Sequence, residues 1–104
     1  MGETMLNSVK IIGCDYIVVE QDRISRDSYT YGEVDHVEQV IKISKELKPQ
    51  RKAETLLHEI IHTVFFMLRK DENEQLVNSM ATVLLQIFRD NPALLVLLSS
   101  LEQS

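Results

Sequence analysis

Two histidines and a glutamate in the second half of the chain have the types and spacing of a metal-dependent hydrolytic site. Residues 58–62 read HEIIH, so His58 and His62 are four residues apart and Glu59 directly follows the first. On an α-helix, residues four apart differ by about 40° in direction and by one turn in height. Both imidazoles therefore project from one helix face and can reach the same metal ion at roughly 2.0–2.1 Å.

The remaining parts of such a site are a base and a third ligand. Glu59 can accept a proton from a water that the metal activates, while that water attacks a carbonyl group. A catalytic zinc site has three protein ligands and one open position, and Asp71, Glu72 and Glu74 are the carboxylates that follow the motif. We favour Glu74, because Asn78 lies four residues later on the same helix face and can hydrogen-bond to a ligand imidazole. Glu72 is the second choice, Asp71 is the third, and Zn2+ is the expected cofactor.

Helices are predicted to position these residues. Apolar residues recur every three or four positions between residues 53 and 68, which predicts a helix that begins at Pro49 and carries the motif. A second helix is predicted from near Asp71 through Phe88, and Asn91-Pro92 begins a short third one. The apolar stripe on that third helix is expected to close the core, with self-association left open.

The residues before Pro49 predict a small sheet. Clusters of β-branched residues, which predict strands, lie at residues 9–12, 16–19 and 37–43. Residues 13–15 are expected to form a tight hairpin turn, and residues 21–35 a loop with a short strand near Tyr29–Tyr31. The prediction is a single α+β domain over residues 1–104: a small antiparallel sheet, the HExxH helix, a second long helix and a short C-terminal helix.

Composition limits the partners. The 104 residues carry a net charge of −5 without a basic cluster, which argues against nucleic acid as the main partner. The N-terminal residues lack the pattern of a secretory signal, and no apolar run is long enough to span a membrane. The single cysteine, Cys14, fits a reducing compartment. We therefore expect a cytoplasmic protein, a monomer or weak homo-oligomer, with no membrane partner.

The stretch from Thr55 to Leu85 resembles the gluzincin-like metallopeptidases of the ImmA/IrrE type. The resemblance rests on TLLHEIIH at residues 55–62 and on EQLVN at residues 74–78. It implies a zincin-like core with His58, His62 and Glu74 as ligands, Glu59 as base and Asn78 behind the ligands. It also implies a peptide or protein substrate such as a transcriptional repressor, an origin in phages or mobile elements, and an edge strand near Val37–Ile43 beside the bound peptide.

Two residues differ from that family's pattern. Ile61 replaces the glycine of HExGH, and Val77 replaces the alanine of ExxAN. The packing behind the site must therefore differ from that of the family.

Three functions are compatible with these residues. The first is a zinc metallopeptidase, the second a zincin-fold module with weak or no activity that binds a protein, and the third a structural zinc site, which would need four closed ligands. A peptidase also needs a donor for the transition state. Candidates for that donor are Tyr29, Tyr31, His36 and Arg51, although each is more commonly a loop or surface residue.

Overall fold

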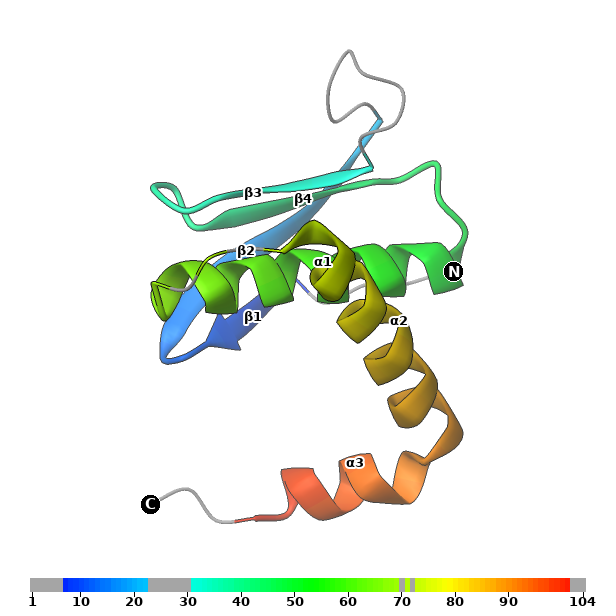
Figure 1. The fold of residues 1–104 in the computed structure, drawn as a ribbon. Helices are drawn as coiled ribbons and strands as arrows, with labels where there is room; N and C mark the ends of the chain where they lie inside the picture. The colour runs from blue at the N-terminus through cyan, green and yellow to red at the C-terminus, as the bar shows by residue number, and fades with distance from the viewer. Residues whose placement is uncertain (1–6, 23–30, 70, 72, 102–104) are drawn as a thin grey trace.

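A four-stranded sheet followed by three helices confirms the predicted α+β class (Figure 1). The structure, a computed structural model, describes residues 7–22, 31–69, 71 and 73–101. Its elements are β1 (Ser8–Ile11), β2 (Cys14–Gln21), β3 (Gly32–Asp35), β4 (Val40–Ser44), α1 (Pro49–Met67), α2 (Glu74–Asp90) and α3 (Pro92–Ser99).

The sheet consists of two hairpins joined side by side. The strand order is β1-β2-β4-β3; β1/β2 and β3/β4 are antiparallel, whereas β2 and β4 run parallel. The prediction of an antiparallel sheet is therefore wrong for the central pair. The reason is that the chain crosses over after β2 and forms β3 first, so that β4 returns in the same direction as β2. Ile41 is consequently paired with both Val18 and Val34, and it is fully buried.

The strand predicted over residues 37–43 begins only at Val40. The Oδ1 atom of Asp35 accepts hydrogen bonds from the backbone N–H groups of Val37 and Glu38, which holds residues 36–39 in a turn. Val37 is 89% exposed, so it does not belong to the buried face. The edge strand on this side of the sheet is therefore β3, not the predicted strand near Val37–Ile43, because β4 has neighbours on both sides.

The predicted first hairpin is confirmed, with its turn one residue earlier. Ile12 and Gly13 form the turn with positive φ angles of 47° and 81°, as in the type I′ turns of two-residue hairpins. Cys14 is then the first residue of β2, paired with Ile11, and packs against the core.

Helix α1 begins at Pro49, as predicted, and separates two small cores. Leu56 packs on one side against the sheet, where Ile41 and Ile43 are fully buried. On another side Ile61 belongs to a second cluster with Val77 and other residues of α2. Apolar residues at intervals of three and four produce both buried faces of α1. The helix faces between these two are left for the candidate functional site.

The C-terminal helix departs from the prediction that its apolar stripe closes the core. No residue of α3 is buried, and Leu95 through Leu98 are 44–68% exposed. The cause is the direction of α3, which turns by 91° after α2 and contacts no other described element (Figure 1). Among the described residues no single helix is long and apolar enough to cross a membrane; only α2 and α3 taken together, bent as they are, reach that length and composition.

Candidate metal centre

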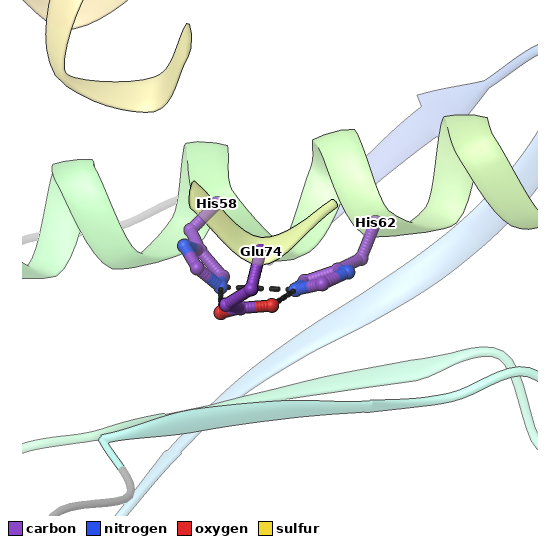
Figure 2. A group of neighbouring side chains, drawn as sticks. All are labelled: His58, His62 and Glu74. Atoms are coloured by element: carbon purple, nitrogen blue, oxygen red, sulfur yellow. Dashed lines mark hydrogen bonds and ion pairs between the residues drawn. The ribbon is translucent and has the colours of Figure 1, made fainter. Parts of the chain in front are cut away.

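Three side chains from two helices converge on one point. His58 and His62 project from the same face of α1, and Glu74 reaches them from the first residue of α2 (Figure 2). The Nε2 atoms of His58 and His62 lie 3.0 Å apart. One carboxylate oxygen of Glu74 lies 2.9 Å from Nε2 of His58, and the other 3.0 Å from Nε2 of His62. This trio is the group of described residues that can hold a metal ion.

The connection between the helices brings Glu74 to the histidines. After α1 ends, Arg69 adopts a left-handed conformation with φ 56°, which reverses the chain. Asn73 then caps α2 by accepting a hydrogen bond from the N–H of Leu76 at 3.0 Å. The helix was predicted to begin near Asp71; it begins at Glu74 because Asn73 provides the cap. The third donor is therefore fixed at a rigid helix start.

The two departures from the family pattern meet in this helix pair. Ile61 and Val77 belong to the same buried cluster, with Ala81, between α1 and α2. They are 5% and 0% exposed. Where the pattern has two small residues, this chain fills the interface with two larger ones. The altered packing lies behind the histidines and leaves their face of α1 open.

The donor chemistry of the trio suits a cation. The Glu74 carboxylate only accepts hydrogen bonds, so without a cation both imidazoles would have to donate to it through Nε2–H. Two N–H donors would then face each other across 3.0 Å. With a cation between them, all three groups present lone pairs to it. Ligands of a tetrahedral zinc at 2.0–2.1 Å lie about 3.3–3.4 Å apart, a few tenths of an ångström wider than the 2.9–3.0 Å between the donor atoms here.

The trio is closed on one side and open on the other. The imidazole side chains are only 17–18% exposed, whereas the Glu74 side chain is 63% exposed. All three line a pocket of ≈ 670 Å³ that extends from α2 across α1 to β3. A small molecule or a peptide segment can therefore reach the trio from solvent.

Glu59 lies in the same pocket, on the side of the sheet. It is 6% exposed, and its backbone carbonyl accepts a hydrogen bond from the buried hydroxyl of Thr63. A Cβ atom at Gly32 would lie 3.3 Å from its Oε2 atom, so the carboxylate lies directly against β3. A buried carboxylate in the same pocket as a trio that could hold a metal is suitably placed for proton transfer.

Comparison of the chain with protein-family models, with curated proteins and with solved structures found no match. The function must therefore be inferred from the chemistry of this pocket.

The other predicted site residues are distributed around the trio. Asn78 lines the pocket, but among the described residues no hydrogen bond joins it to an imidazole. Asp71 is exposed and does not belong to the trio, and Glu72 lies outside the described residues. Of the donor candidates, Tyr31, His36 and Arg51 line the pocket, and Tyr29 lies outside the described residues.

Gly32 is a site residue that the sequence did not reveal. A Cβ atom at this position would lie 2.6 Å from Cγ2 of Thr55 and 3.3 Å from Oε2 of Glu59. Real Cβ contacts are essentially never that short, so β3 can approach α1 this closely only at a glycine. A lone glycine in a polar stretch carries no signal of this contact, because Thr55 is distant in sequence.

Replacing Gly32 with alanine is expected to push β3 away from α1 and to displace Glu59. We expect destabilisation of about 1–3 kcal/mol, the usual effect of overpacking. Thermal unfolding measures this effect. Adding Thr55→Ser, which removes the Cγ2 methyl, should restore much of the stability; no effect of Gly32→Ala would contradict the close contact.

Proposed function

We propose that the protein is a zinc-dependent peptidase in which His58, His62 and Glu74 hold the metal and Glu59 is the general base. The observation that carries the proposal is that the trio and the buried Glu59 carboxylate line one open pocket. Zinc is the ion that two imidazoles and one carboxylate suit best, although other divalent ions fit the same donors.

The chain's own residues then perform the proton transfers. When bound, zinc supplies Lewis acidity, which makes a water more acidic and polarises a carbonyl. Glu59 accepts one proton from the attacking water as its oxygen forms a bond to the carbonyl carbon. The same carboxyl group then donates that proton to the departing amide nitrogen as the C–N bond breaks. The products are a carboxylic acid and an amine, between which a second proton exchange gives a carboxylate and an ammonium group, and Glu59 returns to its ionised form.

The position of β3 supports a peptide as the substrate. β3 is an edge strand, and its residues Gly32, Glu33 and Val34 line the same pocket as Glu59. An extended peptide can pair with the free backbone groups of an edge strand. The substrate would therefore lie along β3 with its scissile bond over the trio. A regulatory protein such as a repressor is the substrate that the family resemblance implies.

A purely structural zinc is disfavoured by the same geometry. Structural sites have four closed protein ligands. Here the described residues supply three, and Glu74 is open to solvent on its outer side. The open position is what a catalytic site requires.

A second candidate function is protein binding through the zincin-like core without turnover. The observation that favours it is the exposed helix α3, in which four successive apolar residues, Leu95 to Leu98, are 44–68% exposed. A helix that is apolar all round is normally covered. This function predicts partner binding that is independent of Glu59.

The proposal is tested by metal content and hydrolysis together. We expect protein purified without chelator or added metal to contain one zinc per chain by mass spectrometry. It should cleave members of a quenched fluorescent peptide library, lose cleavage on treatment with chelator and regain it with zinc. Zinc-loaded protein that cleaves neither the library nor candidate repressors would favour the binding module, and protein that takes up no zinc would reject the metal site.

A further inference from the structure

His36 is anchored in a way that a loop residue does not require. Its Nδ1 atom lies 3.2 Å from the hydroxyl oxygen of Tyr16, a residue only 1% exposed. Its ring is stacked on Phe66 with centroids 3.9 Å apart and planes 2° from parallel. The imidazole is therefore held by one edge and one face, and most of its rotational freedom is lost.

The anchor places His36 beside the metal centre. His58, His62 and Phe66 are successive residues at intervals of four, so they share one face of α1. His36 stacks on Phe66 one helical turn beyond His62, and it lines the same pocket. Phe66 is 52% exposed. It serves as the platform for this imidazole.

The hydrogen bond from Tyr16 fixes which ring nitrogen of His36 carries the proton. Burial raises the pKa of the Tyr16 phenol, so the hydroxyl keeps its proton. A buried hydroxyl needs an acceptor, and Nδ1 of His36 is the acceptor that the described residues provide. A neutral imidazole that accepts at Nδ1 carries its proton on Nε2. Nε2 lies on the far side of the ring from Tyr16.

We propose that His36 is a catalytic residue of the peptidase, whose Nε2–H donates a hydrogen bond to the substrate carbonyl oxygen as negative charge develops on it. The proposal rests on the proposed function. Such a donor acts mainly in the transition state, because it is oriented before the charge appears. Tyr16 is then a positioning residue that acts through His36.

The other donor candidates that the structure describes lack such an anchor. Arg51 is 61% exposed at its side chain and lies 3.9 Å from Glu54, to which it is paired. Tyr31 is 41% exposed, and no described side chain holds its hydroxyl. Of the candidates that the structure describes, His36 alone is held rigidly against the pocket.

The first test is the tautomer of His36 in the metal-free protein. Long-range 1H–15N NMR distinguishes a proton on Nε2 from one on Nδ1. We expect Nε2–H in the unchanged protein and a mixture of tautomers in Tyr16→Phe. A proton on Nδ1 in the unchanged protein would overturn the proposal, without reference to activity.

The second test is hydrolysis of the same peptide library by zinc-loaded variants. His36→Phe keeps a ring to stack on Phe66 and should lower kcat by about 10²–10³-fold, with KM and zinc content little changed. His36→Gln retains an N–H donor and should recover part of the loss. Val37→Ala, at the exposed neighbouring position, is the matched control and should behave as the unchanged protein.

A double-mutant cycle separates positioning from simple stabilisation. Tyr16→Phe should lower kcat in the unchanged background and have no further effect in His36→Phe. Equal effects in both backgrounds would contradict the role of Tyr16.

A His36→Phe variant whose kcat stays within twofold of that of the unchanged protein would reject His36 while leaving the proposed function intact. Zinc-loaded unchanged protein without any hydrolysis would reject the proposed function itself. If His36→Phe fails to fold, the tautomer measurement and His36→Gln decide.

Discussion

Replacing Glu59 with glutamine is expected to lower the rate of peptide hydrolysis by about 10²–10⁴-fold while zinc content stays at one per chain. The amide has the shape of the carboxylate but cannot accept a proton from water. Glu59 does not belong to the trio that can hold the metal, so the metal should remain. Hydrolysis of the peptide library and metal analysis of the same sample measure the two quantities.

Glu54→Gln provides the matched control for that variant. Glu54 lines the same pocket and carries the same charge, but its carboxylate accepts a hydrogen bond from Thr82 at 2.7 Å. Hydrolysis by Glu54→Gln should stay within a few fold of the unchanged protein. Equal losses in both variants would mean that the charge of the pocket, and not a proton transfer at Glu59, supports the reaction. Loss of zinc in Glu59→Gln would assign Glu59 to the metal.

The second large effect is expected from His58→Ala. Removing one of three ligands should weaken zinc binding by well over 100-fold, because the loss of groups that merely orient a ligand already costs 10–100-fold. The structural effect should be local to α2. Among the described residues, the fully buried part of the cluster between the helices consists of Ile61, Val77 and Ala81, so a bound metal would add to a small contact that holds α2 on α1.

Calorimetric zinc titration and amide hydrogen exchange measure these two effects. Exchange should accelerate in α2 and α3 of His58→Ala, and in the unchanged protein after chelation, while β2 and β4 stay protected. His36→Phe removes an imidazole outside the trio and should keep its zinc. If His58→Ala still bound one zinc at the original affinity, another donor set would have to be sought. If exchange rose equally in the sheet and in α2, the two cores would not be separable.

Local signals in the sequence predicted the helices and the residues that converge in the trio. The HExxH spacing and the apolar period of α1 lie within one short stretch, and Pro49 marks its first turn. Glu74 was selected by its helix neighbour Asn78, and the structure brings Glu74, rather than Asp71, to the histidines. The reason given for that selection stays untested, because no described hydrogen bond joins Asn78 to an imidazole.

The features that were missed depend on contacts between distant residues. Whether β4 pairs with β2 in parallel is decided by the crossover, which period-2 patterns do not encode. The exposure of α3 follows from the bend after Asp90, and its apolar residues alone predicted burial. Gly32 against Thr55, and Tyr16 against His36, are pairs more than a dozen residues apart. Without an alignment, nothing in a single sequence connects them.

The connection between α1 and α2 has a consequence for the chain entropy of the site. His58, His62 and Glu74 lie on adjacent helices joined by a short reversal at Arg69. Bringing the three donors together closes only a short loop, so it adds little to the entropy already lost in forming the helix pair. Enclosing Glu59 is different, since it requires β3 and therefore the whole crossover of the sheet. In the proposed peptidase, metal binding would thus be a property of one helical hairpin, whereas proton transfer would be a property of the complete fold.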